Sequence, residues 1–222
     1  MGRTPPTRAS CEGGAVPIHQ VKIVLDGVEP PIWRRLQVPG IASLGWLHAV
    51  FQVAMGWTNS HLHQFIAGRQ VYSDPAFDLD EFEDSPRVRD EHTTRLVDIA
   101  PRVRSAFRYE YDFGDNWVHR VTVESLLSGD PSAAPAAVCL DGARACPPED
   151  CGGIGGYAAL LETIMDPTHE EYDSMLEWLG GDFEPEAFDR AHVNAHLQLL
   201  QWPHTTERRL GSVLLRRDGI SE

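Results

Sequence analysis

Alternation of apolar and polar residues near the start of the chain predicts two strands. In HQVKIVLDGV, residues 19–28, β-branched residues alternate with polar ones, and IWRRLQVPG, residues 32–40, repeats the pattern before a Pro-Gly pair. Such alternation is typical of a strand with one buried face. Because EPP interrupts the pattern between them, we expect an antiparallel pair of strands here.

The period then changes to that of a helix. Ser43 is a candidate N-cap, and Gly56 ends an amphipathic run over residues 44–55. The apolar positions that recur at helical spacing are Leu44, Leu47, Phe51, Ala54 and Met55. The following HLHQFIAGRQVYS, residues 61–73, predicts two short strands around Ala67-Gly68. Residues 74–94 are acidic and without a period, which favours a long surface loop and a candidate lid.

The clearest strands form a hairpin of AFRYEYDFG and NWVHRVTVES, residues 106–114 and 116–125. Period two places Phe107, Tyr109, Tyr111 and Phe113 on one face, and Arg108, Glu110 and Asp112 on the other. The turn would comprise residues 114–116. In the second strand, His119 shares an apolar, inward face with Trp117, Val121 and Val123.

Helical patterns dominate the last third of the chain. One stripe runs from Tyr157 to Ile164, a capping box of Thr168 and Glu171 opens a second helix that ends at Gly180, and a third spans about residues 185–201. The predicted fold class is therefore α+β. We expect a mainly antiparallel sheet with one helix packed across it and a C-terminal helical layer, and the ββαββ opening is compatible with a β-grasp-like core.

The length and the composition favour a single domain. We expect a disordered tail over residues 1–16, one domain over 17–202 and a loose tail over 203–222. Within the domain we expect a sheet part over 17–128, a Cys/Pro/Gly-rich connection over 129–156 and a helical part over 157–202. The sequence shows no signal peptide and no membrane span, so we expect a cytoplasmic protein.

Charge disfavours one class of partner. The chain has a net charge of −14, and Lys22 is its one lysine. Proteins that bind nucleic acid through phosphates need a basic field, and this acidic balance opposes it. Trp33 with Arg34 and Arg35 could form a local stacking surface, or could belong to an ordinary hairpin. Another protein is the partner that the composition favours.

Cysteines are concentrated in CLDGARACPPEDCGG, residues 139–153. Cys139, Cys146 and Cys151 could bind zinc if His61, His63 or His119 supplied a fourth ligand. The alternatives are a rigid Pro-Gly turn with buried thiols, and a redox pair. The glycines of CGGIGGY suit close packing and positive φ angles better than phosphate binding, because the lysine of a P-loop is missing.

Histidine and aspartate suggest a second kind of site. The HLH sequence places His61 and His63 on one face of a strand, where both could bind one metal ion or simply line a polar face. Asp112, Asp115 and His119 gather around the hairpin turn. A carboxylate with an imidazole can serve in general acid–base catalysis or in a hydrolytic metal site. The structural alternative is an inward histidine with a hydrogen-bond partner and aspartates that shape the turn.

Several unusual segments resemble the plasmid pRiA4b ORF-3-like family, also labelled the insertion-element passenger TnpR family. These are PPIWRRLQVPG, AMGWTNSHLHQF, YDFGDNWVHRV, CLDGARACPPEDCGG and LEWLGGDFEPEAFD, within about residues 19–200. The resemblance implies an association with plasmids and transposable elements but no biochemical activity. The TnpR label suggests a resolvase, yet the sequence shows no resolvase layout of a nucleophilic serine with arginines and a basic helix-turn-helix.

Three functions follow as hypotheses. The first is a non-enzymatic accessory or interaction domain of bacterial mobile elements. The second is a metal-dependent hydrolase or nuclease, which requires His61, His63, Asp112, Asp115 and His119 to converge on one point. The third is a DNA-binding recombination accessory protein. The sequence leaves enzymatic activity undecided and favours the first hypothesis.

Overall fold

The computed structural model describes residues 16–79, 87–129, 137–181 and 183–201. Its centre is an eight-stranded sheet with the spatial order β5-β4-β3-β6-β7-β1-β2-β8. The strands are β1 (Val16–Leu25), β2 (Trp33–Pro39), β3 (His63–Ala67), β4 (Gln70–Ser73), β5 (Arg89–Asp90), β6 (Ala106–Tyr111), β7 (Trp117–Gly129) and β8 (Val138–Ala143). The α+β class and the mainly antiparallel sheet are confirmed.

Every strand pair in this sheet is antiparallel except β4 with β5. The predicted pairs β1–β2 and β6–β7 both form. The hairpin of β6 and β7 lies between β3 and β1, so the strands that precede and follow the first helix are not neighbours. The opening ββαββ order is present as β1, β2, α1, β3 and β4.

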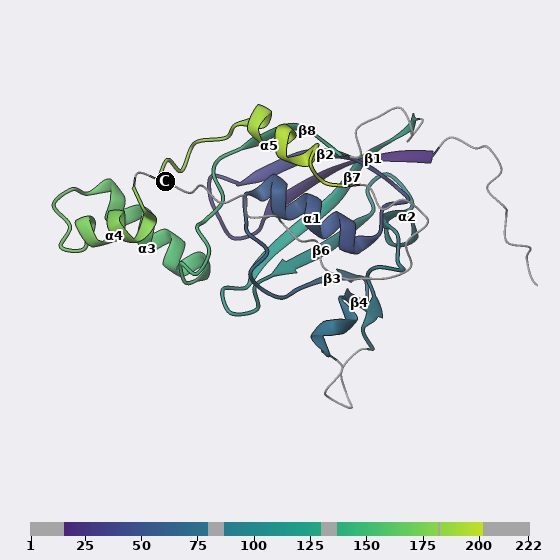
Figure 1. Ribbon diagram of the computed structural model, residues 1–222, viewed down its shortest axis with the longest axis horizontal. Helices are drawn as coiled ribbons and strands as arrows, with labels where there is room; N and C mark the ends of the chain where they lie inside the picture. The colour runs from purple at the N-terminus through teal and green to yellow at the C-terminus, as the bar shows by residue number, and fades with distance from the viewer. Residues whose placement is uncertain (1–15, 80–86, 130–136, 182, 202–222) are drawn as a thin grey trace, which may run out of the picture.

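Helix α1 (Leu44–Met55) lies over one face of the sheet (Figure 1). The Ser43 hydroxyl accepts a hydrogen bond from the Trp46 amide, and Gly56 ends the helix with a φ of 100°. Leu47 and Phe51 are fully buried against the sheet in the main core. The amphipathic run and its two end signals therefore predicted this helix correctly.

The C-terminal helices do not form one layer. They are α3 (Gly153–Met165), α4 (Tyr172–Leu179) and α5 (Arg190–Leu197), and a short α2 (Leu96–Ile99) precedes β6. Helix α5 contacts β8 and α1, whereas α3 and α4 stand together at one end of the sheet (Figure 1). Helix α4 contains no buried residue.

One side chain of α5 closes the outer edge of β8. The Cys139 amide donates to Asn194 Oδ1 at 2.8 Å, and Asn194 Nδ2 donates to the Cys139 carbonyl at 2.9 Å. Arg190 donates to the next carbonyl, that of Leu140. The amide group of Asn194 thus bonds to β8 as the backbone of a further strand would.

Three local expectations differ from the structure. The expected connection over residues 129–156 contains strand β8, and the expected loop over 74–94 contains β5 and a 3₁₀ turn, Pro75–Phe77. The capping box does not form, because Asp166 accepts the hydrogen bonds of Thr168 and α4 begins later. The two expected tails lie outside the described residues, apart from residue 16. None of the helices described has the length and apolarity needed to cross a membrane.

Candidate functional site

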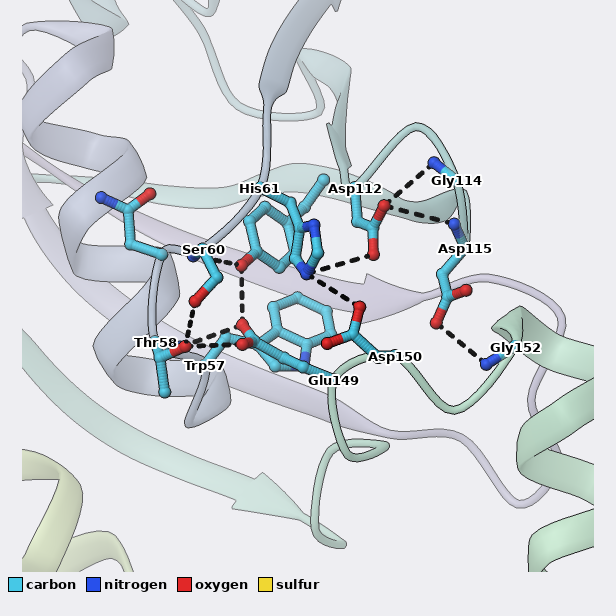
Figure 2. Close-up of polar contacts among 12 residues, drawn as sticks. Trp57, Thr58, Ser60, His61, Asp112, Gly114, Asp115, Glu149, Asp150 and Gly152 are labelled. Carbon is cyan, nitrogen blue, oxygen red and sulfur yellow. Dashed lines mark hydrogen bonds and ion pairs between the residues drawn. The ribbon is translucent and has the colours of Figure 1, made fainter.

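Three segments that are distant in sequence meet at one end of the sheet (Figure 2). His61 comes from the segment between α1 and β3, Asp112 follows β6, and Asp150 precedes α3. His61 Nε2 lies 3.2 Å from Asp150 Oδ1 and 3.7 Å from Asp112 Oδ2. One ligand atom from each of the three residues lies within 4.8 Å of the other two. Although His61 Nε2 is buried, it makes no hydrogen bond of acceptable geometry.

Asp112 is aimed at His61 by the backbone. The strand ends at Tyr111, and Asp112 adopts a left-handed φ of 57°, which aspartate tolerates better than most residues. Its Oδ1 accepts hydrogen bonds from the amides of Gly114 and Asp115. Oδ2 is therefore left facing the imidazole. Strict alternation along the strand predicted that Asp112 points outward with Arg108 and Glu110. The Asp112 side chain is instead 91% buried, because β6 ends at Tyr111 and the alternation stops before Asp112.

Glu149 fastens the segment that carries Asp150. Its carboxylate accepts hydrogen bonds from the Thr58 amide, the Thr58 hydroxyl and the Tyr111 hydroxyl. Burial by itself would raise the pKa of Glu149, but the bonds from Thr58 and Tyr111 outweigh it, so that pKa lies below its usual value. The Trp57 indole also donates to the Pro147 carbonyl. Residues 147–150 are thus held against the end of α1.

Asp115 has a different task from its neighbour Asp112. Its Oδ2 accepts a hydrogen bond from the Gly152 amide at 3.1 Å, at the start of α3. The carboxylate therefore neutralises a helix N-terminus rather than facing His61. Because Asp115 already accepts the Gly152 amide, that amide is not available to bind an anion at the start of α3.

His119 and His63 do not join His61. His119 is fully buried, and its Nδ1 lies 3.2 Å from the Tyr109 carbonyl. Burial lowers its pKa to about 4, which keeps the ring neutral. His61 precedes β3, whereas His63 is its first residue and lies in the core. The five-residue convergence that the hydrolase hypothesis requires is therefore reduced to His61 and Asp112, with Asp150 as an addition.

His63 belongs to a second polar cluster beneath α1. Its Nε2 lies 2.9 Å from Glu91 Oε2, and its ring stacks on His48 with 3.4 Å between centroids. Burial raises the pKa of Glu91 to about 8 and lowers that of His63 to about 3. Near this pair, His92 Nε2 lies 3.3 Å from Asp74 Oδ2.

The same network continues toward the first site. His48 bonds to the Tyr109 hydroxyl and to Asn59 Oδ1, two residues before His61. Gln52 also bonds to the Tyr109 hydroxyl and accepts from the Asn59 amide. These bonds fix the backbone from which His61 projects.

The three cysteines of the predicted zinc site form no disulfide with one another. Cys139, Cys146 and Cys151 are free thiols, and burial raises the pKa of Cys146 and of Cys151 to about 12. Within the residues described, two groups of three or more metal-type ligands converge, and neither contains a cysteine. Arg34 does not form the suggested surface with Trp33, because it is buried and donates to the carbonyls of Ala54 and Ala143.

Two of the ligand-atom separations in the first site match those expected around a bound cation. Two atoms bonded at about 2.1 Å to one ion lie about 3.0–3.7 Å apart for bond angles from about 90° to about 125°. Both separations from His61 Nε2 fall in this interval. In the described structure, no Lys or Arg forms an ion pair with Asp112 or Asp150. A divalent cation would relieve the repulsion between these two carboxylates.

Sequence reasoning missed Asp150 and Glu149 because the three thiols in and around their segment indicate a different kind of metal site. The signal was present, since Glu149-Asp150 lies inside the family-like string that also contains Cys146 and Cys151. Glu91, His92 and Asp74 were missed because the loop that holds them has no period. Nothing in a one-dimensional pattern pairs Glu91 with His63 across 28 positions.

Comparison with known proteins identifies the relatives. A family model described as "Plasmid pRiA4b ORF-3-like protein" matches residues 17–192. The "Uncharacterized protein y4hQ" of Sinorhizobium fredii (strain NBRC 101917 / NGR234) is 35% identical over 197 residues, which covers 86% of this chain and 97% of that protein. The crystal structure of the "Protein of Unknown Function MM3350 from Methanosarcina mazei Go1" superposes with a TM-score of 0.69 at 32% identity, covering 80% of this chain and 97% of that one.

Proposed function

The chain belongs to the plasmid pRiA4b ORF-3-like family, and because the relatives described above carry no assigned activity, we propose from its geometry that it is a non-enzymatic interaction domain with a structural divalent-cation site. The ion would be bound by His61, Asp112 and Asp150. The supporting observation is that ligand atoms from three distant segments lie within 4.8 Å of one another.

The position of the site indicates what the ion would do. Asp150 is exposed, with 72% of its side chain accessible, and it lies two residues before Gly152, the N-cap of α3. A bound cation would tie this segment to the sheet alongside Glu149. One imidazole with two carboxylates suits Zn²⁺ or Mn²⁺ better than Mg²⁺ or Ca²⁺, which prefer oxygen ligands alone.

Metal-dependent hydrolysis is a second candidate, because three ligands leave coordination positions for water. The surroundings favour it less. Glu149 is engaged by Thr58 and Tyr111, and Asp115 by Gly152, so neither is free to act as a general base. The carboxylates without basic partners would also repel a phosphodiester substrate.

Calorimetric titration of the purified protein with zinc chloride and with manganese chloride tests the proposal. We expect binding of about one equivalent with a micromolar or lower dissociation constant, and at least about tenfold weaker binding by Asp150→Asn, because one ligand is lost. Asp141→Asn is the matched control, since Asp141 is an exposed aspartate on β8. Absence of binding by the wild-type protein, or equal binding by Asp150→Asn, would contradict the site.

A further inference from the structure

The negative charge of this molecule is concentrated in one stretch of the sequence. Residues 145–189 contain twelve acidic residues and no lysine or arginine, so they account for nearly all of the net charge of −14. The rest of the chain is close to neutral. Helices α3 and α4 lie within this stretch and stand together beside the sheet (Figure 1).

The acidic side chains of this helical pair are exposed, and no basic side chain of the described residues forms an ion pair with them. Six of them lie on α3, on α4 and on the turn between the helices: Glu162, Asp166, Glu170, Glu171, Asp173 and Glu177. In the part of the chain that the structure describes, none of the six forms an ion pair with Lys or Arg. Their mutual repulsion is a cost that a cationic partner would remove.

The same helical pair exposes large apolar side chains. Trp178 is 51% exposed and Met165 is 80% exposed, and no residue of α4 is buried. Tyr172, Met175, Leu176 and Leu179 are each half-buried at helical spacing. Tryptophan and methionine are enriched at binding surfaces, where they provide contact area and adaptable packing. Removing these apolar side chains from water in an interface would stabilise a complex.

We propose that the α3–α4 pair is a docking surface for a basic amphipathic segment of another protein, with its apolar residues against Trp178 and its Lys or Arg residues against the surrounding carboxylates. Charge complementarity selects this occupant. A second copy of the chain would bring the same acidic surface, and nucleic acid or an anionic membrane would be repelled. Recognition of a basic amphipathic helix by an apolar surface with an acidic surround is an established binding mode for peptides.

This inference builds on the proposed interaction function, but it does not require the cation site. The probe is a synthetic Lys/Leu peptide of about eighteen residues whose leucines recur at i, i+3, i+4 and i+7. The control peptide has the same composition with the leucines scrambled. Binding is measured by fluorescence anisotropy of the labelled peptides, at about 50 mM and about 300 mM salt.

Trp178→Ala should weaken binding of the amphipathic peptide at least about tenfold, because an exposed aromatic anchor is removed. Leu199→Ala is the matched control, since Leu199 is 75% exposed but lies beyond α5, and its affinity should stay within about twofold of the wild-type value. The double variant Asp173→Asn, Glu177→Gln should bind more weakly and with less salt dependence. Because Trp178 is half exposed and these two acids are exposed, the variants should fold normally.

Three results would overturn the docking surface: absence of binding by the wild-type protein at about 100 µM peptide, equal binding of the scrambled peptide, or equal affinity of Trp178→Ala. Repeating the titration on Asp150→Asn separates this inference from the cation proposal. If a variant that no longer binds zinc still binds the peptide, the docking surface is supported and the cation site does not affect it. If the wild-type protein binds zinc but not the peptide, the cation site is supported and the docking surface is refuted.

Discussion

At the scale of single residues, the buried pair of Glu91 and His63 governs how stability changes with pH. Because burial raises the pKa of Glu91 to about 8 and lowers that of His63 to about 3, the folded pair holds one proton between these limits. The unfolded pair loses that proton above the ordinary histidine pKa of 6.5. The folded state then binds more protons than the unfolded state, so stability falls as pH rises from 6.5 to about 8.

Glu91→Gln should remove this dependence, since the variant has no carboxyl group to retain the proton. We expect the wild-type free energy of unfolding to fall by about 2 kcal/mol between pH 6.5 and pH 8, and that of the variant to stay nearly constant. Urea unfolding at several pH values measures the difference. Glu177→Gln, on the exposed side of α4, is the control and should follow the wild-type curve. A variant that still falls by the same amount would show that Glu91 is not the group responsible.

At the scale of elements, the start of α3 shows how closely the chain must approach itself to build the site. A Cβ atom on Gly156 would lie 1.8 Å from the Cys151 carbonyl oxygen, and one on Gly153 would lie 2.5 Å from that of Asp115. Both contacts are with backbone and cannot be relieved by a side-chain rotation. These two glycines therefore allow the Asp150 segment and α3 to meet the hairpin of β6 and β7.

The helix provides its own control for this interpretation. Gly156→Ala should destabilise the protein by about 2–4 kcal/mol, because main-chain atoms would have to move. Gly155→Ala has open space around its new methyl group and should stabilise α3 by about 0.5–1 kcal/mol. Thermal unfolding of both variants measures the contrast. Equal effects of the two substitutions would refute the close approach.

These elements also show what sequence patterns could and could not predict. Period and end signals predicted α1, and alternation predicted the hairpin of β6 and β7, because both depend on residues near in sequence. Strand β8 was missed because Pro, Gly and Cys residues around it hide a short alternation, and it forms by pairing with β2 a hundred residues earlier. For the candidate site, the sequence predicted His61 and Asp112 but not Asp150. Asp150 reaches the site because its neighbour Glu149 bonds to Tyr111, which is distant in sequence.

At the scale of the whole molecule, the sheet provides the hydrophobic core, whereas the acidic helical pair provides an exposed surface. The sheet holds the core beneath α1, with Phe51, Tyr109 and Trp117 among its large buried side chains. Helix α4 contributes no buried residue, so its presence adds little to the core. An element that adds little stability but exposes apolar and charged side chains is typical of a surface that contacts something else. The proposed cation site lies where the two parts join.

The bonds of Asn194 to β8 have a consequence for behaviour at high concentration. An open sheet edge is a template on which another chain can add a strand, and such addition leads to aggregation. By occupying both the amide and the carbonyl of Cys139, Asn194 denies that edge to a second molecule. Asn194→Ala should therefore self-associate with rising concentration in light scattering, whereas His192→Ala, on the exposed side of the same helix, should not. Monodisperse Asn194→Ala would contradict this role, and self-association would mean that the Asn194 amide group is needed, beside Arg190 at the Leu140 carbonyl, to keep the protein from polymerising through the edge of β8.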